Sequence, residues 1–104
     1  MTEPKTPTIT LTESERRGRY ALLHEDGRET ELTYAIRPDG LAFDHTFTPR
    51  DLRHEGAAKK LLLHAVEDMR ARGLQVIPVC PYVSLQFDRH PEWQDVLVEK
   101  FRRT

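Results

Sequence analysis

The sequence predicts a mixed α+β fold in which a mostly antiparallel sheet contains one parallel pair of strands. Segments of alternating apolar and polar residues, separated by short turns, fill the first half of the chain and are typical of consecutive antiparallel strands. The second half changes to the apolar period of an amphipathic helix, followed by a short run rich in β-branched residues. A helix that connects two strands of one sheet is a crossover, so those two strands are expected to run parallel.

The first half is expected to form a meander of strands joined by tight turns. Asp26-Gly27 is a dipeptide favoured in two-residue hairpins. In Pro38-Asp39-Gly40 the proline presets φ and the glycine accepts a positive φ. A further turn is expected at Arg16-Arg17-Gly18. The strands are expected at residues 8–12, 19–25, 29–37 and 41–48, the first of them at the edge of the sheet.

The second half is expected to contain the crossover helix, a buried strand and further helical turns. Apolar residues recur at helical spacing from Ala58 to Met69, with charged residues between them. Gly73 follows at the position of a left-handed C-terminal cap. The crossover helix is therefore expected at residues 56–72, the strand at 75–80, one or two helical turns at 82–89 and a last helix at 94–103.

Length and composition indicate one globular domain with a charged surface. The 104 residues suffice for a sheet and a helical layer, so we expect a flexible leader at residues 1–7 and a single domain at 8–104. A net charge of -1 with interspersed signs does not favour a nucleic-acid or membrane partner. The single cysteine excludes an intramolecular disulfide. The polar N-terminus does not resemble a signal peptide, so we expect a cytoplasmic protein. We also expect a monomer or a weak dimer.

The turn before the crossover helix has the features of an anion site. Arg53-x-x-Gly56-x-Ala58 directly precedes the helix, whose first amides have no partner within the helix. These amides and the positive end of the helix dipole suit a pyrophosphate, and Lys59 and Lys60 add positive charge. Gly56 allows the backbone to approach a phosphate closely. The alternative is an ordinary strand-to-helix turn closed by a glycine, because so short a motif recurs by chance.

Pro78 interrupts the strand predicted at residues 75–80. Proline cannot donate a hydrogen bond to a sheet ladder, so pairing with the neighbouring parallel strand is expected to fail near this residue. Strands that splay apart leave unpaired backbone groups, and a ligand with amide groups, such as the pantetheine arm of coenzyme A, can complete the pairing. The alternative is that Pro78 lies at an edge or a bulge.

Cys80 and His45 are the candidate reactive side chains. They lie in or at the end of the two strands that flank the proposed cleft, where a thiol can act as a nucleophile and an imidazole as a base. Alternatively, Cys80 only packs in the core and His45 is a structural hydrogen-bonding residue. The histidines and the cysteine show no metal-ligand spacing, so no metal is expected.

Four segments occur in a characteristic order along the chain: Asp44-His45-Thr46, Leu52 to Ala58, Val76 to Val83, and His90-Pro91-Glu92-Trp93. Each is a weak motif by itself. Together, in this order and at these separations, they resemble the short, single-domain branch of the GNAT superfamily of N-acetyltransferases over about half of the chain. The resemblance implies a sheet that is splayed at its parallel pair, with coenzyme A in the gap.

The resemblance implies an acetyl-CoA-dependent N-acetyltransferase whose acceptor amine belongs to a small molecule or a protein. Phe47 and Thr48 would offer backbone groups to pantetheine. Cys80 matches a cysteine near the acyl-thioester end, and His45 matches a histidine on the facing strand. Tyr82 falls near the position of a tyrosine that protonates the departing thiolate. The turn that would hold the pyrophosphate comprises Arg53, His54, Glu55, Gly56, Ala57 and Ala58, with Lys59 beside it.

One departure from this branch is His54, where a glycine usually stands. The histidine leaves the R-x-x-G-x-A pattern whole, but it can narrow the turn or contact a phosphate.

The sequence leaves two functional hypotheses of different class. In the first, an amine attacks the acetyl-CoA thioester directly or through an acyl-Cys80 intermediate. In the second, the protein is a non-catalytic module that binds coenzyme A or another protein.

Overall fold

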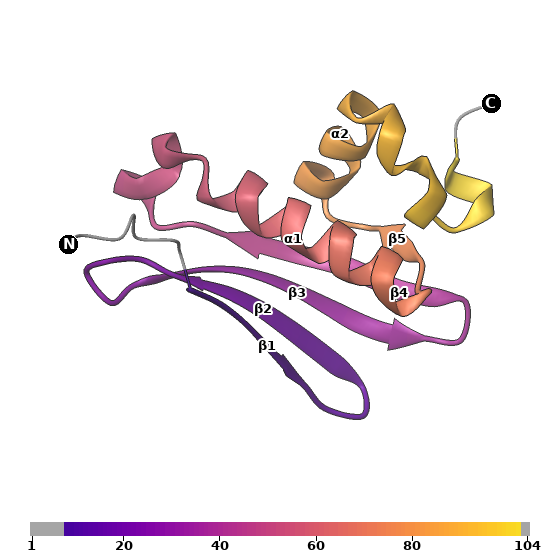
Figure 1. Cartoon of the computed structure of the whole chain (residues 1–104), viewed down its shortest axis with the longest axis horizontal. Helices are drawn as coiled ribbons and strands as arrows, with labels where there is room; N and C mark the ends of the chain where they lie inside the picture. Colours follow the sequence, from indigo (N-terminus) through magenta and orange to yellow (C-terminus); the bar gives the residue numbers. More distant parts are fainter. Residues whose placement is uncertain (1–7, 103–104) are drawn as a thin grey trace.

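The computed structural model describes residues 8–102 and contains a five-stranded sheet with helices packed on one face (Figure 1). The strands lie in chain order; the first four are antiparallel neighbours, and the fifth runs parallel to the fourth. This arrangement confirms the predicted α+β fold and its parallel pair. The leader expected at residues 1–7 lies outside the described residues. The strands are β1 (Thr8–Glu13), β2 (Arg17–Leu23), β3 (Glu29–Arg37), β4 (Gly40–Phe47) and β5 (Val76–Pro78).

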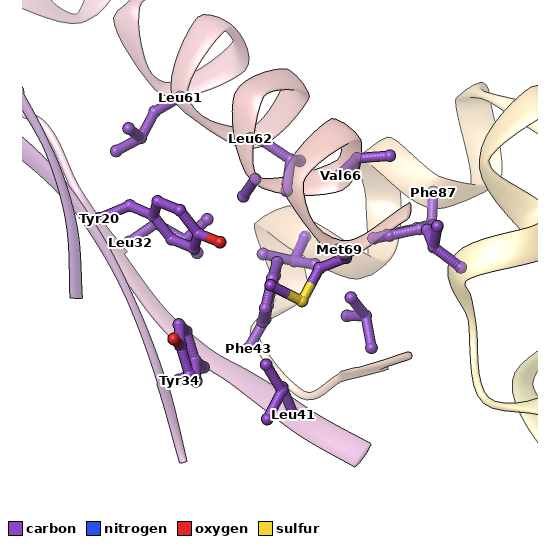
Figure 2. Packing of buried hydrophobic residues seen from close by; sticks show 14 of the residues in the cluster. Tyr20, Leu32, Tyr34, Leu41, Phe43, Leu61, Leu62, Val66, Met69 and Phe87 are labelled. Carbon is purple, nitrogen blue, oxygen red and sulfur yellow. The ribbon is translucent and has the colours of Figure 1, made fainter. Parts of the chain in front are cut away.

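The crossover between β4 and β5 contains helix α1 (Ala57–Arg72), as the apolar period predicts. Its buried side chains form one stripe that packs against apolar and aromatic residues of the sheet (Figure 2). Gly56 and Gly73 bound the helix in the left-handed conformation, with φ of 74° and 67°, which glycine adopts readily. The shared core includes Leu61, Leu62, Ala65, Val66 and Met69 of α1 and Tyr20, Leu32, Tyr34 and Phe43 of the sheet.

The turn expected at residues 16–18 is misplaced, because Gly18 lies inside β2. The chain turns between Ser14 and Arg17, where the Ser14 N–H donates to the Arg17 carbonyl at 2.8 Å. Gly18 pairs with Tyr34 on β3, and a Cβ atom on residue 18 would lie 2.1 Å from Tyr34 Cζ. The glycine therefore makes room for a buried aromatic ring and does not serve the turn.

The segment after α1 forms a shorter strand than expected and then a helix. β5 ends at Pro78, two residues before the predicted limit, because the chain turns there and the Val79 N–H donates to the Ile77 carbonyl at 3.0 Å. The nitrogen of Pro78 itself faces away from β4, on the side where the Val76 carbonyl accepts from Val98, so its missing N–H is not what ends the ladder. Helix α2 (Pro81–Arg89) follows where helical turns were expected. Pro81 occupies its first position, where a missing N–H leaves no helical hydrogen bond unmade.

The last helix expected at residues 94–103 is wrong. The described part of this segment contains two short 3-10 helices, η2 (Pro91–Val96) and η3 (Glu99–Phe101). Between them, Leu97 forms a parallel bridge with Val76, and the Val98 N–H donates to the Val76 carbonyl at 3.0 Å. The extended backbone here supplies hydrogen-bond partners to the backbone groups on the outer edge of β5. A helix could not supply them, because its backbone groups bond to one another.

Two buried tyrosine hydroxyls attach α1 and β1 to the middle of the sheet. Tyr20 Oη donates to Asp68 Oδ2 on α1 at 2.5 Å, and Tyr34 Oη donates to Glu13 Oε2 on β1. Arg72 lies 3.4 Å from the Glu13 carboxylate and 3.3 Å from that of Asp68. Burial raises the pKa of Tyr34 to about 12, so at neutral pH its phenol keeps the proton that it donates.

Replacing Gly18 with alanine is expected to destabilise the fold by about 2 kcal/mol, because the added methyl group overlaps the Tyr34 ring. Equilibrium unfolding in urea measures the loss. The control is Gly27→Ala, since residue 27 has a φ of 92° but open space around it and carries only a backbone strain of roughly 1 kcal/mol. Wild-type stability in Gly18→Ala would contradict the packing argument.

Candidate active site

β4 and β5 pair over a short stretch and then diverge. Their ladder runs from the pair Leu41–Val76 to the pair Phe43–Pro78. The last bond is donated by the Cys80 N–H to the Phe43 carbonyl at 2.8 Å. β4 continues beyond this point without β5 beside it. The parallel ladder therefore ends near Pro78, as expected, and the break in backbone pairing between the end of β4 and the start of α2 is hereafter called the gap.

The backbone of Thr46 faces this gap. The Ile36 N–H is bonded on the β2 side of β3, at 2.8 Å, and strand residues turn their backbone groups alternately to either side. The odd-numbered residues of β3 therefore direct their N–H and carbonyl groups to β4. Of these, Thr33 pairs with His45 and Glu31 pairs with Phe47, so both β4 residues bond to β3. Thr46, between these two, directs its N–H and carbonyl away from β3. Phe47, expected to offer backbone groups to a ligand, turns them to β3, and Thr46 takes that place.

The start of α1 is open and suited to an anion. A 3-10 helix that the sequence pattern does not predict, η1 (Arg50–Glu55), leads into it. The first bond of α1 is donated by the Lys60 N–H to the Gly56 carbonyl at 3.1 Å, so the N–H groups of residues 57–59 have no partner within the helix. The first turn of α1 contains no acidic residue, and a Cβ atom at residue 56 would meet nothing within 4 Å. This geometry can receive a phosphate group.

The basic side chains near this helix start come from η1. Arg53, His54 and Glu55 are exposed. Arg53 Nε donates to the carbonyl of the buried residue Thr48 at 3.4 Å, which keeps the guanidinium beside the end of β4. The residues expected to bind a pyrophosphate, Arg53 to Lys59, are thus brought together with Thr48 around the start of α1.

Arg28, in the β2–β3 turn, holds η1 in place and was not found from the sequence. Its Nη1 and Nη2 atoms lie 2.8 Å from the two carboxylate oxygens of Asp51, and Nη2 also contacts Asp26 at 2.7 Å. The hydrogen bonds from Arg28 lower the pKa of Asp51 to about 2. Two loops that are distant in sequence are therefore joined by one bidentate ion pair at the base of the anion site.

Cys80 and Tyr82 lie on the helical side of the gap. The Cys80 side chain is buried, with its Sγ 3.7 Å from Thr46 Oγ1, and the residue is the N-cap of α2. Tyr82 is partly buried against the core. Burial raises the pKa of Tyr82, so its phenol is protonated at neutral pH. The thiol of Cys80 and the hydroxyl of Thr46 therefore meet on the helical face.

His45 lies on the opposite, open face of the sheet. Its neighbour Thr46 reaches Cys80, and successive strand residues point to opposite faces. His45 Nε2 lies 3.2 Å from Glu31 Oε2, and slightly more than half of the His45 side chain is exposed. The structure thus places His45 and Cys80 on either side of the gap and does not join them as a pair.

The residue before His45 is the extra residue of a β-bulge. Thr33 pairs with His45 and Tyr34 with Phe43, so Asp44 has no register partner on β3. Its carboxylate accepts hydrogen bonds from Thr33 at 2.8 Å and from Arg17 at 3.0 Å. Although burial alone would raise the pKa of Asp44, these hydrogen bonds lower it. A bulge of this kind re-aims the side chains that follow it.

Thr46 and Glu31 are the candidate site residues that sequence reasoning missed. Thr46 is part of the Asp44-His45-Thr46 segment, so its place opposite Cys80 could have been inferred from the alternation of side chains. Glu31 stands fourteen residues before His45 along the chain, and its contact depends on the β3–β4 register and on the bulge. No local pattern in the sequence reports that register.

Residues 8–102 contain a further hollow, away from the gap. No group of three or more histidine, cysteine or carboxylate side chains in this range is arranged to hold a metal ion. No helix in it is long and apolar enough to cross a membrane. A hollow of about 460 Å³ lies at the opposite end of α1, between the β3–β4 turn and Gly73, and shares no residue with the gap.

Comparisons with known proteins agree with this fold. The model of the GCN5-related N-acetyl-transferase family matches residues 19–96. The structure is also similar to the NMR solution structure of a GCN5-like protein from Staphylococcus aureus that is proposed to be an N-acetyltransferase. The TM-score is 0.64 and the sequence identity 26%, over 85% of this chain and 86% of that one. The chain belongs to the GCN5-related N-acetyltransferase family, as its motifs predict.

We expect Arg28→Gln to return the pKa of Asp51 from about 2 toward its ordinary value of about 4. An NMR titration of the carboxylate carbons measures both values. Because the folded pKa is the lower one, the ion pair stabilises the protein above about pH 4, and this contribution is lost as the pH falls toward 2. Arg37→Gln, at the far end of β3, is the control. The same Asp51 titration in Arg28→Gln and wild type would show that the contact is absent in solution.

Proposed function

We propose that this protein transfers an acetyl group from acetyl-CoA to an amine in the gap between β4 and β5. The observation that carries the proposal is that the gap and the open start of α1 adjoin. The ladder ends at Phe43 and Pro78, and η1 leads directly from the end of β4 to the unpartnered amides of residues 57–59 (Figure 1). A ligand with a phosphate end and an amide-containing arm matches both features.

The residues around the gap fit the parts of coenzyme A. The amides of residues 57–59, with Arg53 and His54 nearby, would hold the pyrophosphate. The N–H and carbonyl of Thr46 would pair with the amide groups of pantetheine, which adds a strand-like segment to the free edge of β4. The open space at Gly56 allows the phosphate to come close to the backbone.

In the proposed reaction His45 acts as the base. It accepts a proton from the amine as the nitrogen attacks the thioester carbonyl carbon. The C–N bond forms, the C–S bond breaks, and coenzyme A leaves as a thiolate. Tyr82, protonated at neutral pH, can supply a proton to that thiolate. The first-turn amides of α2 can stabilise negative charge on the carbonyl oxygen.

The geometry favours direct transfer over an acyl-Cys80 intermediate. A cysteine nucleophile needs a base beside its thiol, but the hydrogen-bond partner that the structure gives Cys80 is the hydroxyl of Thr46. His45 lies on the other face of the sheet. In the direct route Cys80 shapes the wall of the gap and does not carry the acyl group.

The acceptor is expected to approach from the open face of the sheet. His45 and Phe47 are exposed there, and the described helices pack on the other face. The β1–β2, β2–β3 and β3–β4 connections are short turns and offer little chain to enclose a metabolite. An amine at the end of a flexible chain, on a small molecule or a protein, suits this surface.

Gly56→Ala is expected to weaken coenzyme A binding about tenfold or more, equivalent to about 1.4 kcal/mol, because alanine resists the φ of 74° at the phosphate turn. Isothermal titration calorimetry measures the affinity. Gly73→Ala is the matched control, since residue 73 has a φ of 67° and is also surrounded by open space. It should lose similar stability and no affinity. Equal affinities in the two variants would contradict the proposed phosphate site.

Cys80→Ala is expected to keep the rate of acetyl transfer within about tenfold of wild type. The loss of transition-state stabilisation is then less than about 1.4 kcal/mol. Turnover with a panel of amines and mass spectrometry of the intact protein are the measurements. Loss of turnover together with an acetyl adduct on wild-type Cys80 would replace direct transfer with the covalent route. Binding of coenzyme A with no turnover for any amine would favour the non-catalytic module.

A further inference from the structure

We infer that Glu31 is a positioning residue, which holds His45 in the form that carries its ring proton on Nε2 and leaves Nδ1 free to accept a proton. The inference rests on the proposed function where it concerns catalysis. Its structural part, the state of the His45 ring, stands on the contacts alone. Glu31 belongs to β3 and His45 to β4, and both side chains lie on the open face of the sheet.

The contact between the two side chains determines which ring nitrogen is protonated. His45 Nε2 lies 3.2 Å from Glu31 Oε2. An ionised carboxylate only accepts hydrogen bonds, and a neutral imidazole has one N–H and one acceptor nitrogen. A lone pair on the nitrogen that faces the carboxylate would be repelled by it, so this contact favours the form with the proton on Nε2. Nδ1 is then the atom that can take a proton from an attacking amine.

Glu31 is itself held by a second contact. Its other oxygen, Oε1, accepts a hydrogen bond from Arg19 Nε at 2.8 Å. Arg19 also contacts Glu29 Oε1 through Nη2, at 2.9 Å. The guanidinium thus fixes the carboxylate from β2, while Oε2 remains directed at β4. This order of base, carboxylate and supporting group is one by which enzymes orient a catalytic imidazole.

The bulge at Asp44 supports the same reading. Without it, the residue opposite Thr33 would be Asp44 and His45 would point to the face that carries α1, since a shift of one residue exchanges the two faces. With the extra residue, His45 shares the open face with Glu31. The Asp44 carboxylate is already bonded to Arg17 and Thr33. Glu31 is consequently the carboxylate that the structure gives to His45.

When His45 accepts the amine proton it becomes an imidazolium next to the Glu31 carboxylate. The pair then carries opposite charges, so the Glu31 carboxylate stabilises the protonated ring. Glu31 itself neither contacts the amine nor takes up a proton. It acts through His45, and its removal should lower the rate of transfer while leaving coenzyme A binding unchanged.

The chain offers a matched pair of variants for the test. Glu31→Gln and Glu29→Gln remove the same charge from the same strand and face, and both lose a contact with Arg19. Of the two, the structure gives only Glu31 a contact with His45. A difference between the variants therefore reports the pairing with His45 and not the loss of charge or of sheet stability.

Nitrogen-resolved NMR spectra of the His45 ring above neutral pH provide the first measurement. We expect a single Nε2–H form in wild type and in Glu29→Gln, and a mixture of the two tautomers in Glu31→Gln, because a carboxamide can both donate and accept. The same ring spectrum in all three proteins would overturn the inference, whether or not the protein is an enzyme.

Acetyl transfer provides the second measurement. Glu31→Gln is expected to lower kcat about tenfold or more with the KM for acetyl-CoA unchanged, while Glu29→Gln stays near wild type. Equal kcat in the two variants would show that the pairing does not serve catalysis. If wild type has no transferase activity but the tautomers differ as expected, the proposed function fails and the pairing of Glu31 with His45 stands.

Discussion

The parallel pairing of β4 with β5 can extend no further than Phe43 and Pro78, and the proposed site depends on this limit. The chain turns tightly at Pro78, where the Val79 N–H donates to the Ile77 carbonyl at 3.0 Å instead of to β4, and α2 starts three residues after Pro78. Beyond that point the free edge of β4 presents polar backbone groups that require partners. The crossover helix then starts at the same end of β4. The tight turn at Pro78 thus ends the pairing at the end of β4 from which η1 leads to the anion site.

The gap divides the chemistry of the site between two faces of the sheet. On the helical face lie the buried Cys80 and the partly buried Thr46 and Tyr82. On the open face, His45 lies among charged side chains in contact with solvent. A thioester is best protected on the first side, and on the second the proposed base is accessible to an amine that arrives from solvent. The alternation of side chains along β4 is sufficient to produce this division.

The sequence predicts the elements well where the signal is local. The apolar stripe of α1, the caps at Gly56 and Gly73, and the end of β5 at a proline all follow from short-range rules. Gly18 shows where such rules fail, because the reason for that glycine is a tyrosine ring on another strand. The C-terminal segment fails similarly, since residues 97–98 are extended to satisfy β5 rather than by their own preference.

The same distinction applies to the site. The proposed phosphate-binding turn, residues 53–58, lies within one short segment, so its residues can be proposed from the sequence alone. Arg28 and Glu31 could not, because their contacts with Asp51 and His45 link separate strands and loops. A one-residue bulge decides which face His45 occupies, and bulges leave little trace in a single sequence. Side chains that support functional residues are therefore harder to identify than the functional residues themselves.

The bridge between Leu97 and Val76 has a consequence for the energetics of ligand binding. β5 is bonded on one side to β4 and on the other to the segment that contains Leu97 and Val98, so it behaves as an inner strand although it is short. It cannot shift sideways to meet a ligand without breaking bonds on one of its flanks. The separation of β4 and β5 is therefore already fixed in the free protein. Binding of the proposed ligand then does not have to order a mobile strand edge, which would cost conformational entropy.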